Sequence, residues 1–286
     1  MLHKVLFFAF LNFVMLTHEL MASKTESSSA LNAIVKKGLQ YSNQGKRDEA
    51  KRCFQKAADQ GNAIAQHNLG VLLEQEGNLT EAKTWYQKAA EQGYAAAQNN
   101  FGRLLGKEGN ISETKVWYQK AAEQGYALAQ YNLCILLYEK GNLAEAKVWL
   151  QKAADQGYAF AQNNLGFLLE DEGNLTEAKK WYQKAAEQGN SKAQSNLGVL
   201  LGQEGKLAEA KEYFQKAAEQ GYPPAQFNLG VFLEKTGDLA EAKIWCQKAA
   251  EQGYAPENLK LSRSIRSQIV EWVLGIITDL YNKLKG

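Results

Sequence analysis

The sequence predicts an all-α, right-handed α-solenoid of antiparallel helix hairpins, built from seven 32-residue units and closed by a C-terminal capping helix. Two observations support this prediction. The motif AAEQG or AADQG ends on a glycine that recurs every 32 residues without insertion, at Gly61, Gly93, Gly125, Gly157, Gly189, Gly221 and Gly253. Within each period, apolar residues fall at helical spacing on both sides of a short turn. A fixed period of this length is typical of a stacked repeat array.

Each unit is predicted to contain two short helices, as in the copy that begins at Asn62. The first helix is expected over Ala65–Gln75, with Gly77 and Asn78 ending it because both residues tolerate the left-handed conformation. The second helix is expected over Thr80–Gln92, with a buried stripe at Ala82, Trp85, Tyr86, Ala89 and Ala90. Short turns place neighbouring helices antiparallel. A single hairpin cannot bury both of its faces, so stability should accumulate as hairpins stack.

The N-terminal 22 residues differ from the rest of the chain. One basic residue, Lys4, precedes the 12-residue apolar run Val5–Leu16, and Ala22 is a small residue at a plausible cleavage point. This pattern predicts a signal peptide over residues 1–22, cleaved near Ala22, and therefore export to the outside, the periplasm or the secretory-pathway lumen. The run is short for a membrane span, and the alternatives are an uncleaved anchor or a misassigned start.

The remaining segments follow the repeat grid. Residues 23–29 form a polar linker, and the array occupies residues 30–253 in units 30–61, 62–93, 94–125, 126–157, 158–189, 190–221 and 222–253. The first unit lacks the Ala-Gln-x-Asn-Leu signature, which suits an N-terminal cap. Residues 254–286 predict an amphipathic capping helix. Its wide apolar stripe leaves contact with a membrane surface, or oligomerisation, through Ser262–Gly286 as the alternative.

Composition and motifs argue against several classes of function. The 33 Lys and Arg residues are interspersed with 31 Asp and Glu residues, a net charge of +2, so no nucleic-acid partner is expected. Cys53, Cys134 and Cys246 make no regular framework, and His67 is the only histidine after residue 22. These residues form no metal-ligand spacing or catalytic triad, and no phosphate-binding loop occurs. We therefore predict no enzyme activity, no cofactor and no metal.

The run AxAQxNLGxLL followed by EAKxWYQKAAEQG resembles the Sel1-like repeat, a relative of the tetratricopeptide repeat, over about residues 30–253. The chain departs from the Sel1-like pattern in its inner turn, where the compact Gly-Asn-Leu-x-Glu-Ala is similar to tetratricopeptide units. The resemblance implies a protein or peptide partner. Some secreted Sel1-like proteins have been described as β-lactamases or penicillin binders, but they carry a cysteine pair in every repeat, and this chain lacks those pairs.

Positions that vary from repeat to repeat suggest where a ligand binds. Three variable series lie on the first helix, and their members within one unit are three and four residues apart, so they share one helical face. The series are His67, Asn99, Tyr131, Asn163, Ser195, Phe227; Val71, Arg103, Ile135, Phe167, Val199, Val231; and Glu74, Gly106, Tyr138, Glu170, Gly202, Glu234. The resemblance to tetratricopeptide-like stacks implies that the first helices line a concave groove.

An asparagine that does not vary lies beside these positions, and the resemblance implies that it holds the backbone of a bound peptide. Its amide offers both a donor and an acceptor, although it could instead cap or bridge within the repeat. Arg103 is the only arginine on this face, which gives no basic clamp for a carboxyl terminus. The predicted peptide-binding residues are Asn68, Asn100, Asn132, Asn164, Asn196, Asn228, His67, Asn99, Tyr131, Asn163, Phe227, Arg103, Ile135, Tyr138 and Phe167.

The prediction is an exported, non-catalytic scaffold or adaptor that binds a peptide or protein along the concave face of the solenoid. The alternatives are a β-lactamase-like secreted enzyme and a membrane-peripheral scaffold anchored by the C-terminal helix. Three N-glycosylation sequons begin at Asn78, Asn110 and Asn174 in the inner turns. The Gly-Asn turn explains these asparagines equally well.

Overall fold

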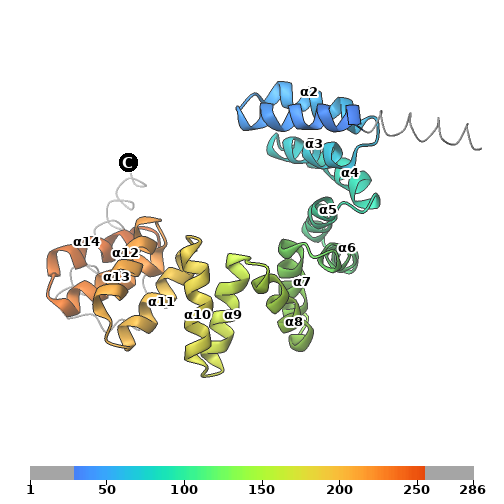
Figure 1. Ribbon diagram of the computed structural model, residues 1–286. Coiled ribbons are helices and arrows are strands. Elements are labelled where there is room, and N and C mark those ends of the chain that lie inside the picture. The colour runs from blue at the N-terminus through green and yellow to red at the C-terminus, as the bar shows by residue number, and fades with distance from the viewer. Residues whose placement is uncertain (1–28, 255–286) are drawn as a thin grey trace, which may run out of the picture. The chain divides into compact units, whose positions relative to one another are not determined.

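The computed structural model of the chain describes residues 29–254, and every regular element in that range is an α-helix (Figure 1). The predicted signal peptide, nearly all of the polar linker and the predicted C-terminal helix lie outside the described residues. The first described helix covers residues 29–43. It is followed by α2 (Arg47–Ala58), α3 (Ala63–Gln75), α4 (Leu79–Glu91), α5 (Ala95–Lys107), α6 (Ile111–Glu123), α7 (Ala127–Glu139), α8 (Leu143–Asp155), α9 (Ala159–Asp171), α10 (Leu175–Glu187), α11 (Ser191–Gln203), α12 (Leu207–Glu219), α13 (Pro223–Thr236) and α14 (Leu239–Glu251).

The two helices of the first full repeat begin slightly earlier than the sequence predicts, and an asparagine caps each of them. The Asn62 side chain accepts a hydrogen bond from the backbone N–H of Ala65 at 2.9 Å, so α3 begins at Ala63. In the same way, Asn78 accepts from the backbone N–H of Glu81 at 3.3 Å, and α4 begins at Leu79. A side-chain acceptor at this place satisfies one of the unpaired donors of the first turn.

Glycine ends the helices at both kinds of turn. Gly77, inside a repeat, has φ +82°, and Gly93, between repeats, has φ +89°. A side chain is strained at these values, whereas glycine adopts them freely. The recurrence of glycine every 16 residues, alternating between the two turns, therefore sets the length of every helix.

The described residues divide into two compact units, 29–142 and 143–254, and each is treated by itself. In both units each helix packs against the next one along the chain. First helices of successive repeats also contact one another directly, α5 with α7 in one unit and α11 with α13 in the other. The first helices thus form a continuous face within each unit, which is called the first-helix face below.

Large side chains fill the space between the two helices of a repeat. Tyr86 in the first unit and Tyr182 in the second are completely buried, and each lies against a glycine of the preceding helix. A Cβ added to Gly166 would lie 2.7 Å from the Tyr182 ring. The glycine is therefore required by close packing between a first helix and its second helix.

Buried glutamines join each repeat to the one before it. The Gln98 side chain donates to the carbonyl oxygen of Ala90 at 3.1 Å and accepts from Gln124 at 2.7 Å. The same pair of bonds recurs at Gln66, Gln162, Gln194 and Gln226. Because both ends of each buried amide have a partner, it fixes the stacking of neighbours without leaving an unsatisfied polar group.

The substitution Gly166→Ala is expected to lower the free energy of unfolding by about 1–3 kcal/mol, because the new methyl group overpacks the contact with Tyr182. The matched control is Gly202→Ala on α11, where a Cβ would meet only Ala210, at 4.0 Å. Alanine should stabilise that helix by up to about 1 kcal/mol. Urea unfolding followed by circular dichroism measures both changes. Equal effects of the two substitutions would contradict this account of the packing.

Candidate functional site

In several repeats, the asparagine that precedes the first-helix leucine links that helix to the first helix of the previous repeat. Asn132 donates to Asn99 Oδ1 at 2.8 Å, and Asn196 donates to Asn163 Oδ1 at 3.2 Å. In the last repeat, Asn228 donates to Ser195 Oγ at 3.1 Å. The asparagine thus reaches the residue that lies just before its counterpart in the previous repeat. One function of this half-buried residue is to bridge repeats.

The other members of the series take different positions. Asn68 donates to the carbonyl of Ile64 in its own helix at 2.8 Å, and Asn164 accepts from Asn163 at 3.1 Å.

The variable position just before this asparagine is largely buried in several repeats, and Asn99 and Asn163 are only 1% and 6% exposed. Their side chains are closed off from solvent, so contact with a ligand would require neighbouring helices to separate. This variable position, counted among the predicted binding residues, adjusts the packing between repeats.

His67 shows the same role with a different side chain. Its Nε2 lies 3.1 Å from Asn100 Nδ2, and its ring packs against those of Tyr86 and Tyr94, with centroid distances of 5.7 and 5.2 Å. Nδ1 is buried and has no hydrogen-bond partner among the described residues. Burial lowers the pKa of His67 from 6.5 to about 4, because the protonated ring would lose its hydration.

Arg103 is committed to an ion pair. Its Nη2 contacts both carboxylate oxygens of Glu74, at 2.7 and 2.5 Å, and the Tyr86 hydroxyl donates to the same carboxylate at 3.0 Å. Burial by itself would raise the pKa of Glu74, but the hydrogen bonds from Arg103 and Tyr86 hold it below its usual value. The one arginine predicted on this face is therefore not free to receive a peptide carboxylate.

The predicted apolar anchors divide between the two compact units. Tyr131, Ile135 and Tyr138 lie on α7, in the unit that ends at residue 142, and Tyr138 is 68% exposed. Phe167 on α9 and Phe227 on α13 lie in the other unit. Phe167 is 63% exposed, whereas Phe227 is half buried and contacts the ring of Tyr254, with a centroid distance of 6.0 Å. The anchors are therefore two groups, one on each unit.

A groove in the second unit brings several of the variable positions together. It has a volume of about 390 Å³ and is lined by residues of α11, α12 and α13. Asn228, from the predicted binding set, contributes an amide. The apolar lining comes from Val199, Val231, Phe214 and Phe232. The side-chain amine of Lys235 lies at the same groove and makes no ion pair with any residue in the range 29–254.

Residue 202, which lines the groove, is a glycine. At the equivalent position the other repeats carry Glu74, Gly106, Tyr138, Glu170 and Glu234. A Cβ at Gly202 would have open space on all sides but one, where Ala210 lies 4.0 Å away. A long side chain at this position would therefore extend into the groove between α11 and α13.

Phe232 and Lys235 are among the residues of this groove that the sequence analysis did not single out. Phe232 occupies a position where the other full repeats have Leu72, Leu104, Leu136, Leu168 and Leu200, and its ring lies 6.0 Å from that of Phe214. Lys235 lies where those repeats carry Gln75, Lys107, Glu139, Asp171 and Gln203. The single aromatic residue in a series of leucines was the available signal, and it points to the sixth full repeat.

The cysteines and the metal-ligating side chains of the described range were compared with the predictions. The three cysteines are free, and no group of three or more His, Cys, Asp or Glu residues between 29 and 254 could hold a metal ion. None of the helices described is both long and apolar enough to cross a lipid bilayer. The first-helix face and its groove are therefore the features from which function is argued.

Comparison with known proteins agrees with this architecture. The Sel1 repeat model matches residues 95–126, 127–158 and 159–190, and the tetratricopeptide repeat model matches residues 35–99 and 195–256. No curated protein sequence matches the chain. The mixture of the two models fits repeats that combine a Sel1-type outer turn with a compact inner turn.

Two solved structures share the fold. A Sel1 repeat protein from Oxalobacter formigenes is 28% identical, with a TM-score of 0.66 over 79% of this chain and 98% of its own. A protective antigen of uropathogenic Escherichia coli strains, which displays an SLR fold, is 31% identical, with a TM-score of 0.64 over 78% of this chain. The chain spans about half the length of that antigen, 54%.

The stacked hairpins and the first-helix face define a helical repeat protein. Within that class, the chain is a Sel1-like repeat protein of the tetratricopeptide-like superfamily. Repeats of this kind commonly serve as scaffolds for protein–protein interaction, and their families are generally non-catalytic.

The pKa of His67 predicts a loss of stability in acid. The folded value of about 4 lies below the unfolded value of 6.5, so the unfolded chain binds more protons between these pH values. The free energy of unfolding should fall as pH drops from about 6.5 to about 4, by up to roughly 3 kcal/mol. The control is His67→Asn, which places the residue found at Asn99 and Asn163. Urea unfolding at several pH values measures the difference, and a gap between the two proteins that does not change with pH would contradict the assignment.

Proposed function

We propose that the chain is an exported, non-catalytic scaffold that binds a peptide or protein segment along its first-helix face, the concave face expected of such arrays, with the groove between α11 and α13 as its main anchor site. The observation that supports this is the groove itself, a hollow at variable positions of the repeat. The rest of the first-helix face supplies the exposed apolar side chains and the half-buried asparagines.

The lining of the groove indicates the kind of segment that it fits. Val199, Val231 and Phe232 offer an apolar surface, while Asn228 and Lys235 add one amide and one positive charge. A volume of about 390 Å³ accommodates one or two side chains rather than a whole helix. The groove suits an apolar or aromatic anchor residue of a peptide that has a carboxylate close by in its sequence.

The asparagine series extends the contact beyond the anchor. Asn228 uses one N–H in a bond to the preceding repeat and keeps an acceptor and a second donor. Such amides match the N–H and C=O groups of an extended chain. The anchor would therefore determine affinity, and the asparagines would orient the backbone.

Blocking the groove tests the proposal. Gly202→Tyr introduces the side chain found at the equivalent Tyr138, so the helix tolerates it while the ring fills the groove. Gly202→Ala leaves the groove open and is the matched control. Partners crosslinked to the chain without residues 1–22 are identified, and their affinity is then measured by calorimetry. Tyrosine should lower that affinity at least about tenfold, and alanine should leave it unchanged. Equal binding by all three proteins would place the site elsewhere.

Export is tested separately. Expression of the full chain in a host that secretes proteins should yield a mature form that begins near Ser23, detected by mass spectrometry of the extracellular or periplasmic fraction. The control replaces two apolar residues of Val5–Leu16, Phe7 and Phe8, with Asp, which should leave the chain uncleaved inside the cell. A native chain that stays uncleaved in the cytoplasm would contradict export and leave the binding proposal intact.

A further inference from the structure

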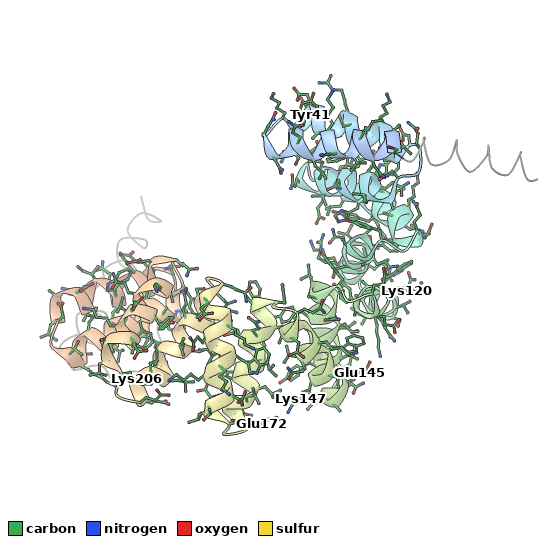
Figure 2. The ribbon with its side chains drawn as sticks, in the orientation of Figure 1. Tyr41, Lys120, Glu145, Lys147, Glu172 and Lys206 are labelled. Carbon is green, nitrogen blue, oxygen red and sulfur yellow. The ribbon has the colours of Figure 1, made fainter. Side chains whose placement is uncertain are left out.

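An ion pair recurs between neighbouring repeats. A lysine on the second helix of one repeat contacts a glutamate at the end of the first helix of the next repeat, 25 residues later. The pairs are Lys51–Glu76, Lys83–Glu108, Lys147–Glu172 and Lys179–Glu204. Figure 2 labels Lys147 and Glu172, whose Nζ and Oε1 atoms are 2.5 Å apart. Each pair is partly exposed, so its contribution to stability is modest, but its recurrence fixes where a carboxylate lies between two repeats.

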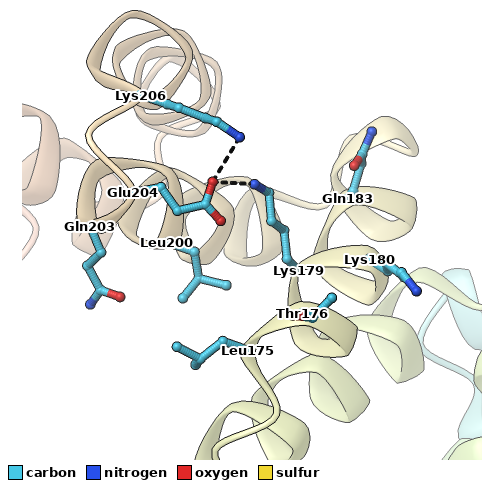
Figure 3. Close-up of a pocket in the computed structure, with 9 residues that line it drawn as sticks. All are labelled: Leu175, Thr176, Lys179, Lys180, Gln183, Leu200, Gln203, Glu204 and Lys206. Carbon is cyan, nitrogen blue, oxygen red and sulfur yellow. Dashed lines mark hydrogen bonds and ion pairs between the residues drawn. The ribbon is translucent and has the colours of Figure 1, made fainter.

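The pair between the fourth and fifth full repeats, Lys179–Glu204, shows the position of this carboxylate in detail (Figure 3). The Glu204 carboxylate accepts from Lys179 at 2.5 Å and lies 3.0 Å from Lys206. It borders a hollow of about 540 Å³ whose apolar wall includes Leu175 and Leu200. Hydrogen bonds from the two lysines lower the pKa of Glu204. A carboxylate between two ammonium groups, beside two leucines, is thus an arrangement that this repeat already stabilises.

The equivalent hollow in the first unit has lost the carboxylate. It measures about 380 Å³ and lies between α6 and α7, where Ile111 and Leu136 take the places of Leu175 and Leu200. Lys115 takes the place of Lys179, but the residue equivalent to Glu204 is Lys140, and the residue equivalent to Lys206 is Asn142. The positive charge that normally meets a carboxylate therefore meets a second positive charge.

No group in the described range neutralises this pair. Neither Lys115 nor Lys140 forms an ion pair with any carboxylate between residues 29 and 254. In the last repeat Thr236 replaces the glutamate and removes the charge facing Lys211 without reversing it. The hollow between α6 and α7 is the one described repeat junction where the charge is reversed. Two like charges beside an apolar wall are unfavourable until an anion lies between them.

We propose that this hollow, bordered by Ile111, Ser112, Lys115, Leu136 and Lys140, binds the carboxylate side chain of an acidic segment in a partner protein, as the hollow of Figure 3 holds Glu204. The ligand carboxylate replaces the missing glutamate and accepts hydrogen bonds from both lysines. Ile111 and Leu136 cover the methylene carbons of the acidic side chain, which a small inorganic anion lacks. The site lies on other helices than the groove and does not depend on it.

Charge reversal at residue 140 tests the site. Lys140→Glu restores the glutamate found at Glu108 and Glu172, so it should fold and form its own pair with Lys115. The probe is an acetylated, amidated hexapeptide of alternating leucine and glutamate, followed by fluorescence anisotropy at low salt with the full chain. Its twin carries glutamine in place of glutamate. We expect the glutamate peptide to bind at least about tenfold more tightly than its twin, and Lys140→Glu to lower that affinity at least about tenfold.

Two further variants make the outcome unambiguous. Lys211→Glu changes the charge of the chain by the same amount at the junction where Thr236 takes the place of Lys140, and it should bind like the native chain. Glu204→Lys converts the hollow of Figure 3 into a second site and should raise the peptide stoichiometry from one to about two. Equal binding by native and Lys140→Glu chains would overturn the proposal. Displacement of the peptide by inorganic phosphate more readily than by added acetate at equal ionic strength would also overturn it, since the site would then take free anions.

Discussion

The contact between the second helix of one repeat and the first helix of the next is the interaction on which everything else depends. A single hairpin leaves one apolar face uncovered, and only the neighbour can cover it. The buried glutamines act at this contact, because Gln98 bonds to Ala90 of the previous repeat and to Gln124 of its own. The contact is therefore both apolar and directional. A shift of one helix along the other would break a buried hydrogen bond and expose apolar surface at once.

A repeated contact of this kind leaves only some positions free to vary. Tyr182 requires a glycine at 166, and the glutamine requires a carbonyl at a fixed distance. Gly202 and Lys140 lie at the edges of the contact, where the scaffold tolerates several residue types. At the first position the loss of a side chain opens a groove, and at the second a change of charge leaves a hollow without its carboxylate. Both features arise where one residue differs between repeats that share the same helices and buried contacts.

The sequence predicted the helices well because the same residues specify them in every repeat. Glycine at fixed spacing ends each helix, and the apolar pattern assigns its buried face, so α3 and α4 differ from the predicted ranges by at most two residues. The family follows from the same motifs. Asparagine capping was not considered, and it accounts for the earlier starts at Ala63 and Leu79.

The candidate site was less predictable, because variation alone does not show where a side chain points. The position of Asn99 varies among repeats as that of a ligand-binding residue would, yet Asn99 lies buried against Asn132. Arg103 stands on the predicted face, but Glu74 of the preceding repeat holds it. Both outcomes depend on a partner 29 or 33 residues away. A comparison of single positions cannot detect them, whereas pairs of positions across neighbouring repeats can.

A charge reversal in a repeat protein is informative because equivalent residues in the other repeats show which interaction the position normally makes. In a chain without repeats, Lys140 would be one surface lysine among many. Here the equivalent residue, Glu204, shows which interaction the position normally makes and at what distance, 2.5 Å from Lys179. The junction at Lys140 retains a hollow with an apolar wall at the equivalent positions, but lysine replaces the glutamate and Asn142 replaces Lys206. An acidic side chain supplied from outside would meet two lysines beside an apolar wall, which is the combination that surrounds Glu204 within the chain.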